Sequence, residues 1–375
     1  MVSRRDLHTC GRIVVKVGTS TITYGNGKLN FNRIESLVRQ LADLQNAGKE
    51  VILVSSGAIG VGADRMGYKK VPRTIPEKQA LAAIGQGALL HMYEKLFAEY
   101  GKIVAQVLLT RDDFMERMRY LNATNALLAI LAMQVIPIIN ENDTVVVEEI
   151  KFGDNDTLSA LVTGIVDADL LIILSDVDGL YDSDPHLNSK AVLQSEVTEI
   201  TGEMESNAGT KGSSFSSGGM ATKLKAANMC MAAGVPMVIA NSDIDKVIQQ
   251  IVNGQDIGTL FVPREEKMQA RKRWIAFGSV THGNLIIDAG ALTALVNRGK
   301  SLLASGIIKV EEDFERGAIV AVMTEDGHEA ARGMVNYSSA EIKLIAGHKS
   351  AEIEKILSVK DYDEVIHRNN LWVCK

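Results

Sequence analysis

Lys16 is the first residue whose type and position suggest chemistry. It lies at the end of an apolar run, just ahead of Gly18, in the stretch "VVKVGTS". A buried ammonium group needs a negatively charged partner. That partner is either a bound anion, which is the more economical reading, or a carboxylate in a structural salt bridge, and mutation of Lys16 separates the two.

A second candidate is the Gly- and Ser-rich stretch that includes Ser217, Gly218 and Gly219 and precedes a predicted helix. Backbone N–H groups at the start of a helix lack partners within the helix, so a phosphate could bind there. Lys223 would lie one turn into the helix and could reach back to the same anion. A Gly-Ser loop can equally be a linker, and the spacing alone leaves both readings open.

The run "GDND" places Asp154, Asn155 and Asp156 directly before another helical run. A carboxylate at this position caps the helix and interacts favourably with its dipole, which stabilises it by about 0.5–2 kcal/mol. Capping needs only one of these residues. The others are therefore open to a different role.

The elements that must position these residues follow an alternation of short β-branched runs and longer runs of helical period, which predicts an α/β fold with a mainly parallel sheet. Helices are predicted around 34–44, ending before Gly48, and around 81–96, with Ile84 facing the core, ending before Gly101. The predicted strands are continuously apolar, as strands buried on both faces require; they span 13–17, 51–54, 103–109, 135–139, 170–174 and 236–239.

Ligands of open parallel sheets bind beyond the carboxyl ends of the strands. Polar or glycine-rich segments follow four of the predicted strands, at 16–20, 55–58, 140–143 and 175–181. The sequence lacks a G-x-x-x-x-G-K-[ST] phosphate loop, the protein-kinase signatures and a G-x-G-x-x-G fingerprint after the first strand. Any phosphate must therefore bind to a different kind of site.

The pattern changes after residue 262. We expect a first domain over 1–262, a charged linker over 263–274 and a small, mainly antiparallel β domain over 275–375, with helical pieces at 291–298 and 338–344. The net charge of −6 disfavours a general affinity for nucleic acid or anionic membranes. Three cysteines without paired spacing, and no long apolar segment, lead us to expect a cytoplasmic protein.

Six motifs together resemble the glutamate 5-kinase family, the amino acid kinases of proline biosynthesis: "VVKVGTS", "SSGAIGVG", "INENDTV", "KFGDNDTLSA", "SDVDGLY" and "SGGMATKLKAA". The C-terminal part is similar to the PUA domain that follows the kinase domain in that family. The resemblance implies a three-layer α/β/α kinase domain that transfers the γ-phosphate of ATP, with Mg²⁺, to the side-chain carboxylate of L-glutamate.

Carried over by position, the resemblance implies that Lys16 and Lys223 neutralise the transferring phosphoryl group and that Asp156 holds the two lysines. Asp154 would either bind the ammonium group of glutamate or cap the helix, and the metal ligands stay unassigned. The positions implied to bind glutamate are Ser56, Asp143 and Asn155. The positions implied to bind nucleotide are Ser175, Asp176, Ser217, Gly218, Gly219, Met220, Ala221, Thr222 and Lys223, with serine at 175 and 217 where threonine is common.

A carboxylate acceptor is already ionised at neutral pH, so the implied reaction needs no general base. The resemblance also implies inhibition by proline and a homo-oligomer, a dimer or tetramer. N-acetylglutamate or aspartate is the alternative acceptor. RNA binding through the PUA-like part is the alternative class, but residues 275–375 hold 11 Lys and Arg against 14 Asp and Glu, a net charge of −3 that disfavours it.

Overall fold

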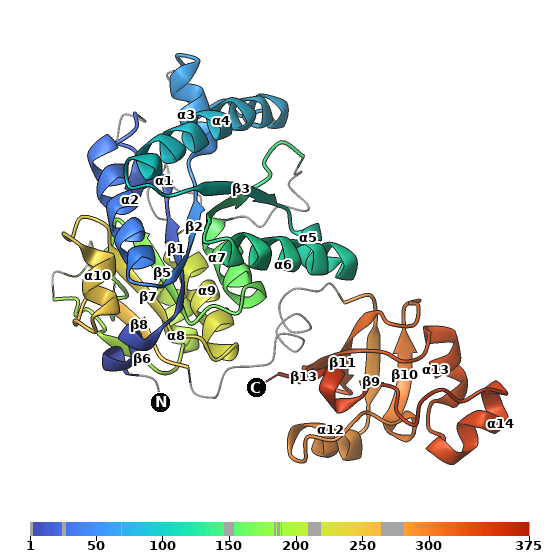
Figure 1. Cartoon of the computed structure of the whole chain (residues 1–375). Coiled ribbons are helices and arrows are strands. Elements are labelled where there is room, and N and C mark those ends of the chain that lie inside the picture. Colours follow the sequence, from blue (N-terminus) through green and yellow to red (C-terminus); the bar gives the residue numbers. More distant parts are fainter. Residues whose placement is uncertain are drawn as a thin grey trace. The chain divides into compact units, whose positions relative to one another are not determined.

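The computed structural model describes residues 3–24, 28–68, 70–145, 154–183, 185, 188, 190–208, 219–263 and 281–374. The chain divides into two compact units, Met1–Met268 and Gln269–Lys375 (Figure 1). This division falls within the predicted linker over 263–274. Residues 264–280 lie outside the described part, so the domain limits stay a prediction.

The first unit is built on one large sheet. Among the described residues it has eight strands in the order β3-β4-β2-β1-β5-β7-β8-β6, and neighbouring strands are parallel except for β7 and β8. The strands are β1 (Arg12–Val17), β2 (Glu50–Ser55), β3 (Val104–Leu109), β4 (Ile136–Glu141), β5 (Leu170–Ser175), β6 (Glu196–Val197), β7 (Met237–Asn241) and β8 (Thr259–Phe261).

Helices cover both faces of this sheet (Figure 1). The apolar side chains of α2, α4 and α10 pack against one face, and α6, α7 and α9 lie on the other. The helices of this unit are η1 (Arg4–Thr9), α1 (Thr19–Ile22), α2 (Phe31–Asn46), α3 (Ala58–Arg65), α4 (Ile75–Glu99), α5 (Asp112–Met115), α6 (Arg117–Ala132), α7 (Asn155–Ile165), α8 (Gly202–Ala208), α9 (Met220–Ala232) and α10 (Val247–Val252).

The alternation of side chains along β1 decides which face receives Lys16. Val15 and Val17 belong to the core cluster beneath α2, α4 and α10. Successive side chains of a strand point to opposite faces, so Lys16 points to the face that α7 and α9 cover. The alternation of side chains along β1 therefore places the Lys16 ammonium group on the face where α7 and α9 begin.

The six predicted strands and the predicted helices around 34–44 and 81–96 are confirmed, with small changes at their ends. Ile103, predicted to begin a strand, lies outside β3 and is 68% exposed, and Ile84 is 38% exposed where a core position was predicted. The short strands β6 and β8 were not predicted, because strands of two and three residues leave too few positions for a pattern.

The second unit contains a smaller sheet with the order β10-β9-β11-β12-β13 among the described residues. All its pairings are antiparallel except β9 with β11, which confirms the predicted mainly antiparallel β domain. Its elements are β9 (Asn284–Ile287), α12 (Ala289–Val296), η4 (Ala304–Gly306), β10 (Ile307–Glu311), β11 (Ile319–Thr324), β12 (Glu329–Met334), α13 (Ser339–Ile345), η5 (Ser350–Glu352), α14 (Ile353–Leu357), η6 (Arg368–Asn370) and β13 (Leu371–Val373).

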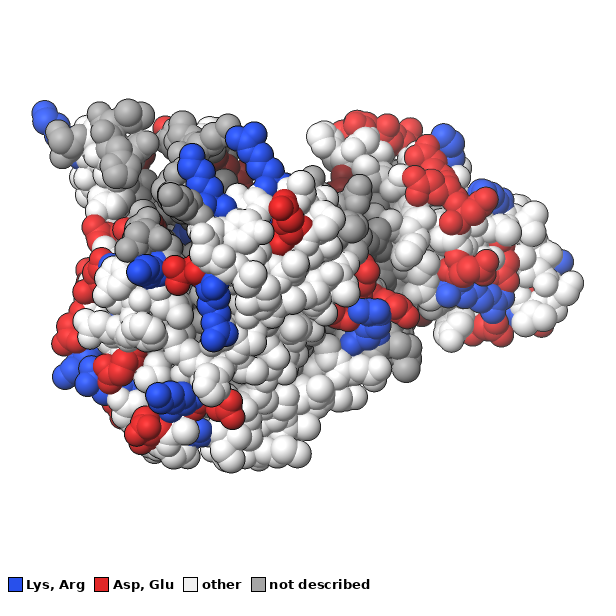
Figure 2. Space-filling view, turned by 90° about the horizontal axis from the view of Figure 1, so that it is seen from above, with Lys and Arg blue, Asp and Glu red and all other residues white. Residues whose placement is uncertain are grey.

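The surface carries charges of both signs. On the face shown in Figure 2, acidic and basic side chains are interspersed and neither sign covers a broad area. Within the described ranges, no helix combines the length and apolar character that a membrane span requires.

Candidate active site

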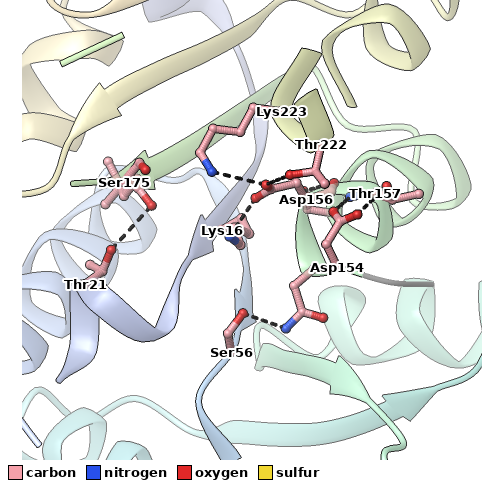
Figure 3. Close-up of polar contacts among 12 residues, drawn as sticks. Lys16, Thr21, Ser56, Asp154, Asp156, Thr157, Ser175, Thr222 and Lys223 are labelled. Atoms are coloured by element: carbon pink, nitrogen blue, oxygen red, sulfur yellow. Dashed lines mark hydrogen bonds and ion pairs between the residues drawn. The ribbon is translucent and has the colours of Figure 1, made fainter. Parts of the chain in front are cut away.

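Four neighbouring strands bring the polar segments of the sequence to one edge of the sheet. In the order β4-β2-β1-β5 the strands are parallel, so their carboxyl ends lie side by side. Each of the four is followed by one of the predicted polar segments. The helices α7 and α9 begin at the same edge (Figure 3).

Asp156 lies at the centre of this site, where two lysines from different elements reach it (Figure 3). Lys16 Nζ of β1 is 2.6 Å from Asp156 Oδ1, and Lys223 Nζ of α9 is 3.2 Å from Oδ2. The carboxylate is fully buried, and the lysine side chains are only 8% and 7% exposed. We call Lys16, Asp156 and Lys223 the ion triad.

The electrostatics of the ion triad follow from burial and charge. Burial alone would raise the pKa of Asp156, but the ammonium groups of Lys16 and Lys223 and hydrogen bonds from Lys16 and Thr222 lower it to about 2. Burial lowers the pKa of Lys16, with Asp156 opposing and Lys223 adding to that shift. At neutral pH the Asp156 carboxylate is therefore ionised, and the side-chain nitrogens of Lys16 and Lys223 both contact it.

Thr222 supports the triad from α9. Its hydroxyl donates to Asp156 Oδ2 at 2.8 Å and also lies 2.8 Å from the carbonyl oxygen of Gly219, the residue before α9. Lys223 lies in the first turn of α9, as predicted, and its side chain is buried. Of the Gly-Ser stretch, Gly219 to Lys223 are described, while Ser217 and Gly218 lie outside the described residues.

Asp154 is the N-cap of α7. Its Oδ1 accepts a hydrogen bond from the backbone N–H of Thr157 at 2.7 Å, and its Oδ2 lies 3.2 Å from the Thr157 hydroxyl. Burial raises the pKa of Asp154, and the hydrogen bond from the Thr157 backbone opposes the shift. Of the two readings that the sequence left open, the contacts favour capping.

Asp154→Ala should lower the free energy of unfolding by about 1 kcal/mol, because the N–H of Thr157 loses its acceptor. Asp154→Asn keeps an acceptor oxygen and should retain most of the stability. Urea denaturation of both variants makes the comparison. Equal stability of the Ala variant and the natural chain, accompanied by a loss of activity, would instead assign Asp154 to the substrate.

Asn155 begins α7 and connects the ends of β2 and β4. Its Nδ2 donates to Ser56 Oγ and to Asn140 Oδ1, each at 2.8 Å, and approaches the carbonyl oxygen of Ser55 at 3.3 Å. Asn140 Nδ2 in turn donates to Gln86 Oε1 of α4 at 2.8 Å. We call this series of hydrogen-bonded side chains the amide relay; it consists of Gln86, Asn140, Asn155 and Ser56.

The structure thus brings Ser56 and Asn155 into contact. Asp143 lies two residues beyond β4 and is half-buried. Ser175 ends β5 and donates to Oδ1 of Asp176, which is exposed. Ser175 and Asp176 therefore lie at the end of the strand on the other side of β1 from Ser56.

Two glycines shape the backbone around the lysine and the serine. Gly57 has φ +101°, a left-handed conformation that favours glycine, and it turns the chain from β2 into α3 directly after Ser56. A Cβ on Gly18 would lie 3.6 Å from Lys16 Nζ. Glycine at position 18 therefore places no side chain against the Lys16 ammonium group.

Sequence reasoning missed Gln86 and Asn140. Asn140 begins the polar segment 140–143, so its position after an apolar strand was the available signal. Gln86 lies within α4 between two glycines, and nothing local separates it from a surface glutamine. Its contact with Asn140 arises only when α4 packs on the sheet.

Comparison with known proteins places this site in a family. The model of the amino acid kinase family matches residues 11–241, and that of the PUA domain matches residues 283–357. A protein named glutamate 5-kinase from Moorella thermoacetica is 54% identical over 99% of this chain and 98% of its own length. Proteins of the same name from Thermoanaerobacter sp. and Geobacter sulfurreducens are 56% and 50% identical, over 97% and 96% of this chain and 98% and 97% of theirs.

Among solved structures, a UMP kinase from Bacillus anthracis matches 68% of this chain and 97% of its own, with 17% identity and a TM-score of 0.46. The family model covers more than half of the chain and every described residue of the ion triad and the amide relay. The chain therefore belongs to the amino acid kinase family and carries a C-terminal PUA domain.

Proposed function

We propose that this chain transfers the γ-phosphate of ATP to the γ-carboxylate of L-glutamate and releases ADP and L-glutamyl 5-phosphate. The observation that carries the proposal is the ion triad, in which Asp156 holds two buried ammonium groups from β1 and α9 at one edge of the sheet. The names of the similar proteins supply the acceptor, L-glutamate.

The reaction must bring an anionic carboxylate onto an anionic phosphate group, in line with the leaving ADP. Two lysines that reach the same point from different elements can neutralise the charge that builds up on the transferring group. An ionised carboxylate attacks without losing a proton, so the site needs no general base. The ion triad meets this demand without a histidine or an arginine.

Within this proposal, Ser56, Asn155 and Asp143 bind glutamate. Asp143 would supply a carboxylate for the substrate ammonium group, while Asp154 caps α7. Ser175 and Asp176, with the segment from Ser217 to Lys223, bind the nucleotide on the other side of β1.

Mg²⁺ would arrive with ATP. Among the described residues, no three His, Cys, Asp or Glu side chains form a group that could hold a metal ion. Mg²⁺ keeps several waters and binds chiefly through substrate phosphates and one or two carboxylates. The ion would add positive charge at the phosphates, and the exposed carboxylate of Asp176, at the proposed nucleotide end, would be one of its ligands.

The test is formation of an acyl phosphate. The purified chain is supplied with ATP, Mg²⁺ and L-glutamate, and hydroxylamine traps the product as a hydroxamate. We expect hydroxamate well above a control without glutamate, with N-acetylglutamate and aspartate as much poorer acceptors. A signal no higher than the control would refute the proposal, and a preference for another acceptor would reassign the substrate.

The remaining parts of the proposal rest on the resemblance of the motifs. We propose a homo-oligomer in the cytoplasm that serves proline biosynthesis and is inhibited by proline. Millimolar proline in the same hydroxamate assay should lower the rate in competition with glutamate; an unchanged rate would remove proline from the proposal. The net charge of −3 over residues 275–375 makes nucleic acid an unfavourable partner.

A further inference from the structure

The direction of each hydrogen bond in the amide relay is fixed by the backbone at one point. The N–H of Glu141 donates to Asn140 Oδ1 at 2.9 Å, and a backbone N–H can only donate. This contact identifies the end of the Asn140 amide that faces Glu141 as the oxygen. It thereby settles an orientation that an isolated amide would leave ambiguous.

The orientation of Asn140 then determines that of Asn155. The oxygen of Asn140 also faces Asn155, so Asn155 must present its NH₂ group there. The same NH₂ group serves Ser56 Oγ and approaches the Ser55 carbonyl. Within the described part of the chain, no group donates to Asn155 Oδ1, and Asn155 is only half-buried.

The relay therefore presents an acceptor next to a donor. Asn155 offers its carbonyl oxygen, and Ser56, whose oxygen already accepts from Asn155, can turn its hydroxyl hydrogen toward a ligand. An ammonium group requires an acceptor and a carboxylate requires a donor. The acceptor of Asn155 and the donor of Ser56 are thus complementary to the ammonium and carboxylate groups of an α-amino acid.

Gln86 is the second restraint on this polarity. Its Oε1 accepts from Asn140 Nδ2 at 2.8 Å, and its side chain is buried. If the Asn140 amide were to flip, its oxygen would face the oxygen of Gln86 and its NH₂ group would face the N–H of Glu141. With Gln86 in its observed orientation, the flipped orientation of Asn140 therefore has a higher free energy.

A close helix crossing holds Gln86 in register with Ser56. A Cβ on Gly85 would lie 1.8 Å from the carbonyl oxygen of Ala58, the first residue of α3, so the backbones of α3 and α4 touch at this point. Ala58 lies two residues after Ser56, and Gly85 immediately precedes Gln86. The crossing fixes both ends of the relay relative to one another.

We propose that Gln86 is a positioning residue that sets the amino-acid specificity of the site. By holding Asn140, it keeps Asn155 Oδ1 directed to the α-ammonium group of the substrate and the Ser56 hydroxyl directed to its α-carboxylate. This inference rests on the proposed function, and it assigns selection for an α-amino acid to a residue that does not itself touch the substrate.

The test compares Gln86→Met, which keeps the length of the side chain but removes the acceptor, with Gln86→Glu, which keeps an acceptor. For each variant the hydroxamate assay gives kcat and KM for L-glutamate, KM for ATP, and kcat/KM for glutarate, which lacks the ammonium group. Gln45→Met is the matched control, because Gln45 Nε2 donates to the carbonyl of Gln134 on the opposite edge of the sheet.

We expect Gln86→Met to raise the KM for L-glutamate about tenfold and to lower the preference for L-glutamate over glutarate by about the same factor, with the KM for ATP unchanged within about twofold. Gln86→Glu should restore most of the preference, and Gln45→Met should behave as the natural chain.

Three results would overturn the inference. An unchanged preference in Gln86→Met would show that Asn140 needs no second restraint. Equal increases in both KM values, with no restoration by Gln86→Glu, would show that Gln86 serves packing alone. If the natural chain forms no hydroxamate with glutamate, the proposed function itself fails and the inference fails with it; the first two results leave the proposed function intact.

Discussion

Lys16→Ala and Lys223→Ala are each expected to lower kcat for acyl phosphate formation by about 10³-fold. Each substitution removes one of the two ammonium groups beside the transferring phosphoryl group, in a buried site where charge is weakly screened. The fold should survive. Asp156 keeps Thr222 and the remaining lysine as partners in either variant.

Single-turnover and steady-state hydroxamate assays measure the effect, and two lysines outside the triad provide controls. Lys225 is exposed two residues after Lys223 on the same helix, and Lys49 Nζ donates to backbone carbonyls of His8 and Cys10. Their Ala variants should retain activity. If the Lys16 or Lys223 variant keeps a rate within tenfold of the natural rate, that lysine does not neutralise the transferring phosphoryl group.

Gly85→Ala is expected to destabilise the chain by about 3 kcal/mol, although alanine is the better helix former. The new Cβ would lie 1.8 Å from the Ala58 carbonyl oxygen and 2.5 Å from the Gly62 nitrogen. Both obstacles are backbone atoms, so α3 and α4 must separate. Ser56 and Gln86 would move apart as a result, and binding of glutamate should weaken together with stability.

Gly87→Ala is the matched control and should have the opposite sign. Gly87 lies two residues further along α4, is exposed, and has no atom within 4 Å of an added Cβ. There the gain in helix propensity is unopposed and should stabilise the chain by about 0.5–1 kcal/mol. Thermal unfolding followed by circular dichroism compares the two. A Gly85 variant as stable as the natural chain would show that the helices separate without cost.

The large sheet and the edge that carries the site could be predicted because their signals are local. Strands buried on both faces are continuously apolar, and polar segments follow where they end, so Lys16 and Ser56 were placed correctly at the sheet edge. The positions of Lys223 in the first turn of its helix and of Asp156 near the start of another helix also follow from local pattern.

The role of Asp154 and the relay through Gln86 could not be predicted, for two different reasons. A carboxylate before a helix suits both a cap and a ligand, and only the bond to the Thr157 N–H decides. Gln86 and Asn140 are 54 residues apart and meet through tertiary packing. Ile84 was misplaced for a related reason, because the crossing with α3 turns a different stripe of α4 toward the core.

The sheet order also divides the strands on the two sides of β1 into two separate stretches of the sequence. On one side of β1 lie β2, β4 and β3, drawn from residues 50–141, and on the other lie β5, β7, β8 and β6, drawn from residues 170–261. A single recombination between residues 141 and 154 of two family members would therefore exchange all the strands of the proposed acceptor side as one block and leave those of the proposed nucleotide side unaltered. The ion triad and the amide relay both join the two inherited blocks, since Lys16 meets Asp156, the partner of Lys223, across that junction and Asn155 donates to Ser56 and Asn140 across it.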